Sequence, residues 1–129
     1  MVWFNGGPGC SSMLGYLKEI GPYIMDDGES AFKPNPYSWN REANLLFIEA
    51  PAGVGYSYCD KDAVCEDFDD FNSSLDNLDA MLSFFKKFPE YAKHKLYLSG
   101  ESYAGVYVPY LAWRMHQYNG GELEEYQKK

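Results

Sequence analysis

Short apolar runs alternate along the chain with longer stretches in which apolar residues recur at helical spacing. Residues 44–48 (NLLFI) form a continuous apolar run, and their length and the turn residues after them favour a strand buried on both faces. Residues 1–4 and 95–99 (KLYLS) are expected to form two more short strands. Before the last of these strands, apolar residues recur with gaps of three and four, which predicts a helix that ends at Phe88-Pro89. One face of this helix would carry Phe68, Phe71, Leu75, Leu78, Leu82 and Phe85.

Two further helices complete the pattern. Ser11 or Ser12 is expected to cap a short helix that runs to Ile20, where Gly21-Pro22 stops it. Residues 105–118 are apolar on most sides, which predicts a buried helix. The order strand, helix, strand, helix, strand, helix is typical of an α/β fold with a mostly parallel sheet flanked by helices.

Composition narrows the classes of protein. The 129 residues suffice for one domain, and 46% hydrophobic and 18% aromatic content excludes a disordered chain. The net charge of −8, without a basic stripe, argues against a nucleic-acid partner. No apolar run approaches the roughly 18–20 residues that a membrane-spanning helix needs, so no membrane span is expected.

The segment 60–79 holds eight acidic residues against one lysine. A solvated helix face is the favoured interpretation of this charge. Calcium binding is the alternative, but the spacing of an EF-hand loop is absent, so no metal is expected. Asn72-Ser73-Ser74 is the only N-glycosylation sequon, and by itself it is a weak indication.

The turn after the 95–99 strand is the first candidate for chemistry. Ser102 stands between an apolar strand and the last helix, with Gly100 two residues before it and Ala104-Gly105 after it. Small residues around a central serine predict a sharp turn that holds the serine above the sheet as a nucleophile. The strict form, G-x-S-x-G, has alanine here in its last place. A serine that only caps the helix is the alternative.

A serine nucleophile for acyl transfer also needs N–H donors for the oxyanion. The backbone N–H of Tyr103 follows the serine at the start of the helix. The loop 5–9 (NGGPG) follows an earlier strand, and the N–H of Gly7 is the expected second donor. Taken alone, that loop could equally be a tight turn.

Three segments together resemble the serine carboxypeptidase family: WFNGGPGCSS (3–12), NLLFIEAPAGVGYSY (44–58) and LYLSGESYAGVYVPYLA (96–112). The pieces GPY, NPYSWN and FFKKFPEY are similar to the same family, so the resemblance runs from residue 1 to about 118. It implies a partial α/β-hydrolase fold. It also implies a serine-type carboxypeptidase that cleaves peptide or protein C-termini through an acyl-enzyme on Ser102, without a cofactor.

The resemblance further implies a site for the terminal carboxylate of the substrate. Asn5 and Glu101 would bind that carboxylate, Glu19 would pair with Glu101, and Trp3 would support the site. Two close carboxyl groups share a proton because both cannot easily ionise, so this pair should work best in acid. Judged without the resemblance, Glu19 would be an ordinary glutamate on a helix surface.

The general base is not evident in this chain. In this fold the order is Ser, Asp, His, yet the 27 residues after Ser102 hold one histidine, His116, and no aspartate. His116 is expected to be a partly buried helix residue, and His94 should lie at the opposite end of its strand. We therefore expect residues 1–129 to be an incomplete domain that lacks a C-terminal portion with the Asp and His, and to be inactive alone.

The three cysteines indicate which disulfides the protein can form. The count is odd, which leaves at least one of Cys10, Cys59 and Cys65 without a partner in this chain. The resemblance implies that Cys10 pairs with a distant downstream cysteine that this chain lacks. Cys59 and Cys65 can pair with each other or remain two reduced thiols.

The residues around Met1 show no signal peptide. Cys10, the sequon at Asn72 and the acid preference nevertheless indicate a lysosomal, vacuolar or secreted parent protein. The oligomeric state stays open.

Two alternatives to the peptidase remain. One is a carboxypeptidase-like acyltransferase or lyase on the same scaffold, and the other is a non-catalytic product of a truncated gene. The presence of Glu101 and Asn5 favours the peptidase.

Overall fold

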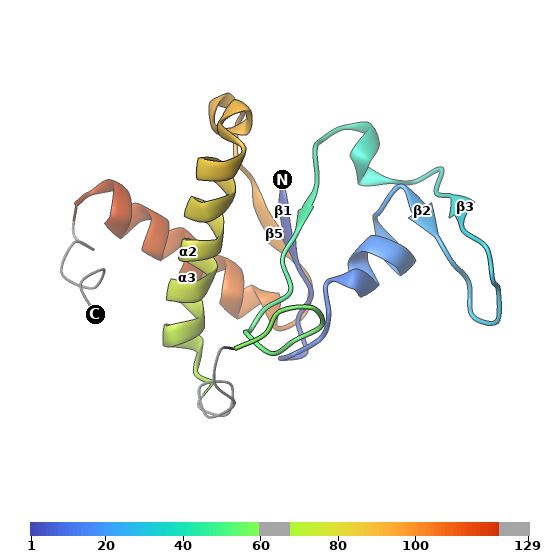
Figure 1. Ribbon diagram of the computed structural model, residues 1–129, viewed down its shortest axis with the longest axis horizontal. Coiled ribbons are helices and arrows are strands. Elements are labelled where there is room, and N and C mark those ends of the chain that lie inside the picture. Colours follow the sequence, from blue (N-terminus) through green and yellow to red (C-terminus); the bar gives the residue numbers. More distant parts are fainter. Residues whose placement is uncertain (60–67, 122–129) are drawn as a thin grey trace.

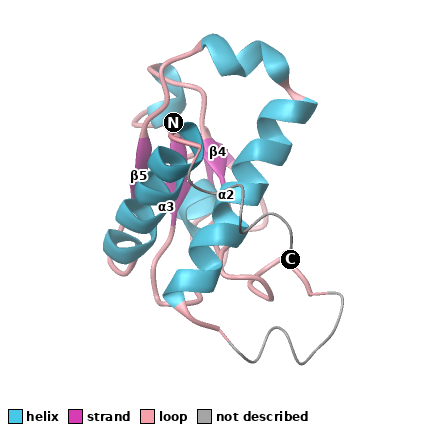
Figure 2. Ribbon diagram, turned by 90° about the vertical axis from the view of Figure 1, so that its left-hand side faces the viewer, coloured by secondary structure: helices cyan, strands magenta, loops and turns pink. Residues whose placement is uncertain are grey.

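The computed structural model describes residues 1–59 and 68–121. Its centre is a sheet of three parallel strands in the order β4-β1-β5, formed by Leu46–Phe47, Val2–Phe4 and Leu98–Gly100. Val2 of β1 pairs with Leu46 on one side and Leu98 on the other. The expected parallel sheet flanked by helices is therefore present (Figures 1 and 2).

Helices lie on both sides of this sheet (Figure 1). On one side are the two long helices, α2 (Asp70–Lys87) and α3 (Ala104–Asn119), which pack against each other. The other side carries the short π-helix η1 (Gly15–Glu19) and a hairpin of β2 (Tyr23–Ile24) and β3 (Lys33–Pro34). Two 3₁₀ turns, η2 (Trp39–Arg41) and η3 (Pro89–Lys93), complete the described elements.

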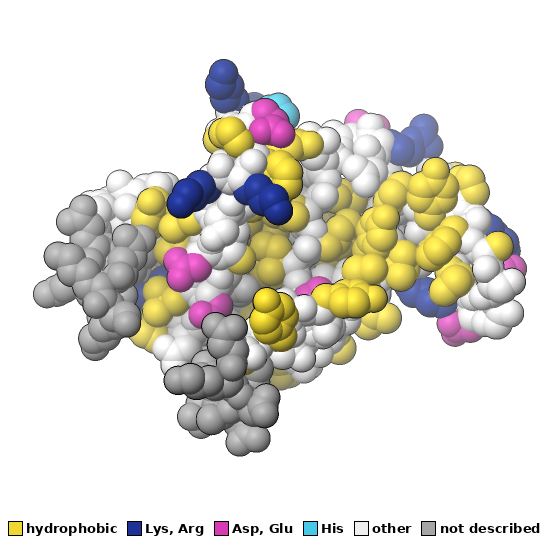
Figure 3. Space-filling view, viewed as in Figure 1, with side chains coloured by type: hydrophobic (Ala, Val, Ile, Leu, Met, Phe, Trp, Pro, Cys, Tyr) yellow, Lys and Arg dark blue, Asp and Glu magenta, His cyan; other side chains and the backbone are white. Residues whose placement is uncertain are grey.

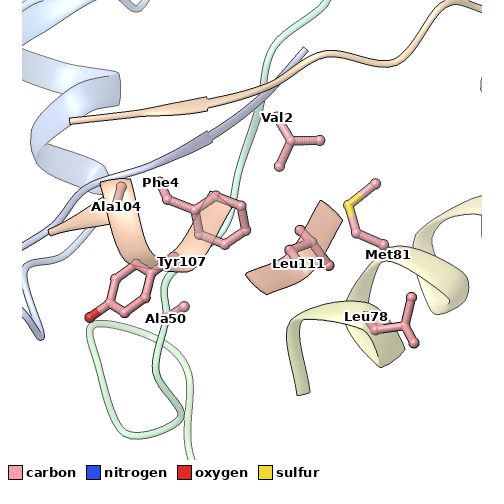
Figure 4. Packing of buried hydrophobic residues seen from close by; sticks show 8 residues of the cluster. All are labelled: Val2, Phe4, Ala50, Leu78, Met81, Ala104, Tyr107 and Leu111. Atoms are coloured by element: carbon pink, nitrogen blue, oxygen red, sulfur yellow. The ribbon is translucent and has the colours of Figure 1, made fainter. Parts of the chain in front are cut away.

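The central strand β1 is buried along its whole length. Its alternate residues Val2 and Phe4 face the long helices, as expected for a strand whose side chains point in turn to opposite faces. They join a cluster made of Val2, Phe4, Ala50, Leu78, Met81, Ala104, Tyr107 and Leu111 (Figure 4). Trp3 faces the other side and packs edge-on against Trp39, with ring centroids 5.5 Å apart. Side chains of β1 thus take part in the packing on both faces of the sheet.

The run 44–48 forms a strand as expected, but it is only partly buried. Within the described part of the chain β4 is an edge strand, so one side of it meets no other strand. The expectation of a strand buried on both faces is corrected to that extent.

Helix α3 also differs from the buried helix that was predicted, because only one of its faces is buried. Tyr107, Leu111 and Arg114 are buried against β1 and α2, whereas Tyr110 and Trp113 are exposed. An apolar helix needs enough neighbours to cover it on every side, and the described residues supply neighbours on one side only.

The predicted stripe of α2 is confirmed from Leu75 onwards, where Leu78 is buried and Leu75, Leu82 and Phe85 pack against the core cluster, but it is wrong at its start. Phe68 precedes the helix, and both Phe68 and Phe71 are exposed. The reason is the buried side chain of Arg114, whose guanidinium lies 3.9 Å from the centre of the Phe71 ring and whose Nε donates to Ser74 Oγ at 2.9 Å. Small and polar side chains of α2 make room for it, so the buried residues are Ser73, Ser74, Asn77, Leu78 and Met81.

Hydrophobic side chains also gather on the surface. In Figure 3 they cover the part of the visible face that carries η1, β2 and β3. Tyr37 is 86% exposed and Phe32 55% exposed in this region. None of the helices in the described ranges is both long and apolar enough to cross a lipid bilayer.

Candidate active site

The carboxyl ends of the three strands meet at one edge of the sheet, because all three run parallel. Asn5 follows β1, Glu49 lies shortly after β4, and Glu101-Ser102 follow β5. In open α/β sheets this edge is where ligands bind. Asn5, Glu101 and Ser102, which the sequence analysis singled out, therefore come together here, although up to 97 positions separate them in the chain.

Ser102 stands at the tip of the turn between β5 and α3 with a φ of 53°. Among the described residues it is the only one other than glycine with a positive φ. An L-residue rarely adopts this conformation, and it is the backbone geometry of a nucleophile elbow. The side chain is exposed, and its Oγ makes no hydrogen bond within the described part of the chain.

Close packing explains two of the three small residues around Ser102. A Cβ added at Gly100 would lie 2.5 Å from the Cβ of Ala104 and 2.5 Å from the carbonyl oxygen of Phe4. At Gly105 an added Cβ would meet nothing within 4 Å in the described residues. Crowding thus accounts for Gly100 and Ala104, while among these residues it gives no reason for a small side chain at Gly105.

The glycine-rich loop lies directly against this turn. A Cβ added at Gly6 would be 2.4 Å from the backbone N of Tyr103 and 3.0 Å from the Cβ of Ser102. Since consecutive Cα atoms are about 3.8 Å apart, Gly7 also lies within about 10 Å of Ser102. Gly7 has a φ of 115°, so the loop uses a conformation closed to most residues. The two motifs face each other as expected.

Asn5 is 1% exposed, and its side-chain amide is held from both ends. Its Oδ1 accepts hydrogen bonds from Trp3 Nε1 at 2.8 Å and from the backbone N of Gly15 at 3.1 Å. Its Nδ2 donates to Glu101 Oε1 at 3.0 Å. With the oxygen occupied by two donors, the NH₂ group is directed at the carboxylate beside Ser102.

Glu19, at the end of η1, completes the carboxyl pair. Partial burial raises the pKa of Glu19 above its usual value, the charge of Glu101 raises it further, and a hydrogen bond with Asn5 opposes the shift. Both glutamates keep exposed side chains in the described structure, so the burial is partial. The fold therefore brings Trp3, Asn5, Glu19 and Glu101 into one cluster.

Ser12 is not the helix cap that was expected. The residue before η1 is Leu14, and no side chain caps that helix. Ser12 is buried instead, accepts a hydrogen bond from the backbone N of Asn5 at 3.0 Å and donates to the carbonyl of Ile48 at 2.6 Å. It links the glycine-rich loop to the end of β4.

Sequence analysis missed Glu49, which organises the same edge. Its carboxylate accepts from the hydroxyl of Ser11 and, at 2.6 Å, from the backbone N of Tyr56, while its carbonyl accepts from Ser57 at 2.7 Å. The available signal was an acidic residue placed directly after the apolar run 44–48, where a parallel strand ends. The loop 51–58 is folded around this one side chain.

Neither histidine lies at this edge. His94 packs edge-on against Tyr91, with centroids 5.7 Å apart, at the amino end of β5. There it lines a cavity of about 560 Å³ together with Met1 and Tyr97, at the amino ends of the strands and away from Ser102. His116 lies near the end of α3, about 18 Å along the helix from its first residue, Ala104, at 1.5 Å per residue. It is exposed rather than partly buried, because Tyr107, Leu111 and Arg114 take the inner face.

The remaining predicted sites are distributed over the surface. Cys10 is exposed and not in a disulfide, while Cys59 is disulfide-bonded and Cys65 lies outside the described residues. Asn72 is exposed in the first turn of α2, and its Nδ2 donates to Asp69, the cap of that helix. Half of the acidic run lies outside the described residues; among those described, no cluster of three potential metal ligands occurs.

Comparison with known proteins agrees with the geometry. The sequence profile of the serine carboxypeptidase family matches residues 1–127. The chain is 48% identical over 112 residues to the lysosomal protective protein of Mus musculus, covering 87% of this chain and 23% of that protein. It is 45% identical over 120 residues to serine carboxypeptidase 24 of Arabidopsis thaliana, covering 92% and 26%.

A pheromone-processing carboxypeptidase of Yarrowia lipolytica is 47% identical over 117 residues, covering 91% of this chain and 19% of that protein. The chain thus spans about a quarter or less of the length of these relatives. The family match extends over nearly all of its residues, and the motifs it contains are those that meet at the carboxyl edge of the sheet. The chain therefore belongs to the serine carboxypeptidase family.

Proposed function

We propose that the complete protein containing this segment is a serine-type carboxypeptidase with Ser102 as its nucleophile. The observation that carries the proposal is the left-handed Ser102 between Glu101, which Asn5 holds, and the Gly6-Gly7 backbone. The proposed nucleophile, N–H donors and carboxylate-binding group then lie in this turn and in the glycine loop that faces it. This combination suits removal of the last residue of a peptide.

In the proposed reaction Ser102 Oγ attacks the carbonyl carbon of the last peptide bond and forms an acyl-enzyme. The N–H groups of Tyr103 and Gly7 would stabilise the oxyanion, since Tyr103 N lies against the glycine loop. The serine proton would pass to a histidine supplied by sequence beyond these residues. That sequence is expected because the relatives are about four times as long.

The cluster around Asn5 would recognise the terminal carboxylate. Asn5 and Glu101 would hydrogen-bond to it, with Glu19 sharing a proton with Glu101 and Trp3 orienting the amide of Asn5. A carboxyl group donates a hydrogen bond only while it is protonated. The raised pKa of Glu19 therefore supports this role, because it keeps a proton on the pair to higher pH.

A lysosomal, vacuolar or secreted location belongs to the same proposal. The disulfide at Cys59 is typical of an oxidising compartment. Asn72 is exposed and would be the glycosylation site in that route.

The test uses the full-length protein and its Ser102→Ala variant. Loss of single residues from the carboxyl end of a peptide is followed by mass spectrometry, and a fluorophosphonate probe reports the reactive serine. We expect trimming and labelling by the wild type and neither by the variant. Labelling without trimming, with acyl transfer to an added alcohol or amine, would favour the acyltransferase. Absence of both activities would favour a non-catalytic protein.

A further inference from the structure

Tyr103, the residue after Ser102, is attached to the other long helix through its side chain. Its hydroxyl donates to Asp70 Oδ2 at 2.9 Å, across 33 positions of sequence. Its ring packs edge-on against Tyr107 with centroids 5.3 Å apart. Asp70 is the first residue of α2, and Tyr103 immediately precedes α3. The hydrogen bond therefore joins the beginnings of the two long helices beside the candidate nucleophile.

Helix capping does not explain Asp70. The cap of α2 is Asp69, whose Oδ1 accepts from the backbone N of Asn72 at 2.7 Å. The second oxygen of Asp70, Oδ1, is buried and has no hydrogen-bond partner within the described part of the chain. Burying an oxygen of a carboxylate without a partner costs folding free energy. Capping of α2 therefore does not account for the placement of this carboxylate.

Asp70 is nevertheless well placed as an acceptor. The N-terminus of α2 favours a negative charge there. The hydrogen bond to this carboxylate is the main reason that the pKa of Tyr103 is raised, so the tyrosine remains a donor. A charge-assisted bond of this kind is stronger and more directional than one between neutral groups.

The backbone of Tyr103 lies in a crowded position beside the glycine loop. Its N lies against Gly6, where a Cβ would come within 2.4 Å. No side chain caps α3 at Tyr103, and the turn before it is the left-handed Ser102. Tyr103 also packs against the core cluster, but among the described residues the bond to Asp70 is the hydrogen bond that joins it to an element other than α3.

We propose that Asp70 is a positioning residue that acts through the Tyr103 hydroxyl to hold the Tyr103 N–H in line for the oxyanion. This inference rests on the proposed function and adds a residue that no motif marks. An oxyanion donor acts on the transition state rather than on the bound substrate. Loss of the Asp70–Tyr103 bond should therefore lower kcat and leave KM nearly unchanged.

The experiment compares Asp70→Leu, Asp70→Asn, Tyr103→Phe and the Asp70→Leu/Tyr103→Phe double variant in the full-length enzyme. We expect Asp70→Leu and Tyr103→Phe each to lower kcat about 10- to 100-fold, with KM within about threefold of wild type. Asp70→Asn should retain most activity, because its amide oxygen can still accept the bond. The double variant should be no slower than the slower single variant, since both remove one interaction.

Ser74→Ala is the matched control. It removes another hydrogen bond between α2 and α3, that to Arg114 Nε, without touching Tyr103. It should lower the melting temperature while kcat stays near that of wild type. A kcat for Tyr103→Phe within twofold of wild type would overturn the inference, as would a rise in KM at constant kcat, which would assign the hydroxyl to substrate binding.

Failure of the inference and failure of the proposed function look different. If wild type trims peptides, Ser102→Ala does not, and Tyr103→Phe behaves as wild type, only the role of Asp70 is refuted. If Asp70→Leu does not fold, Tyr103→Phe still decides, because it removes a single oxygen. A wild type without activity refutes the proposed function itself.

Discussion

Ser102 occupies a backbone conformation that costs an L-residue roughly 1–2 kcal/mol. Glycine adopts it without that penalty. We predict that Ser102→Gly is more stable than Ser102→Ala by about 1 kcal/mol, although both remove the hydroxyl and abolish activity. Thermal or urea unfolding of the two inactive variants measures the difference. Equal stability of the pair would show that the turn stores no strain at this residue.

The carboxyl pair of Glu19 and Glu101 predicts how substrate binding depends on pH. The pKa of Glu19 is raised above 4.5, so a proton is held on the pair in mild acid and lost as pH rises through the shifted pKa. Because the protonated carboxyl donates to the substrate carboxylate, KM for a peptide acid should be low in acid and rise with pH. Glu101→Gln should flatten this rise, since an amide donates at every pH and removes the charge that raises the pKa of Glu19.

The control is the same peptide with an amidated C-terminus, which has no carboxylate to recognise. Its KM should change much less over the same pH range. Superimposable pH profiles for the acid and the amide would remove Glu19 and Glu101 from carboxylate recognition.

At the scale of elements, the glycine loop and the β5–α3 turn depend on each other for space. A Cβ at Gly6 would meet backbone atoms of Tyr103 and Glu101 at 2.4 and 2.7 Å, where no side-chain movement can relieve the contact. We predict that Gly6→Ala lowers kcat/KM by at least about 100-fold through displacement of Tyr103. Steady-state kinetics on folded protein tests it.

The comparison for Gly6→Ala is Gly28→Asn. Gly28 has a φ of 83° and open space around its Cα, and asparagine tolerates such a backbone. This variant should have activity and expression close to those of wild type. Normal kinetics for Gly6→Ala would mean that the two motifs can separate without loss of function.

Elements whose shape depends on local pattern were predicted well, and those that depend on neighbours were not. The α2 helix was predicted to end at Phe88-Pro89, and it ends at Lys87. Its apolar stripe was predicted correctly from Leu75 to Phe85, but the exposure of Phe71 was not, because the buried Arg114 comes from another helix. Likewise the apolar residues of α3 predicted a buried helix. The number of apolar residues in a helix does not say how many neighbouring elements cover it.

At the scale of the whole molecule, Ser102 meets neither histidine in the described part of the chain. We predict that residues 1–129 expressed alone hydrolyse peptides at least about 10⁴-fold more slowly than the full-length protein. The exposed edges β4 and β5 should also make this piece prone to association. Turnover assays and light scattering on the purified piece check both. Robust turnover that Ser102→Ala abolishes would mean that the base lies within these residues.

The sequence by itself determined the family, the strand–helix order and the identity of Ser102 as the residue of the turn, because each is carried by residues close together in the chain. Small residues around a serine and a glycine-rich loop after a strand are local signals. Tertiary structure alone decided what is joined across distance: the Asn5–Glu101 bond, the enclosure of Glu49 and the Asp70–Tyr103 bond. The physical reason is that a polar contact depends on where two elements end in space. The parallel packing of β4 and β5 on β1 fixes where these elements end, and this cannot be read from the spacing of residues along the chain.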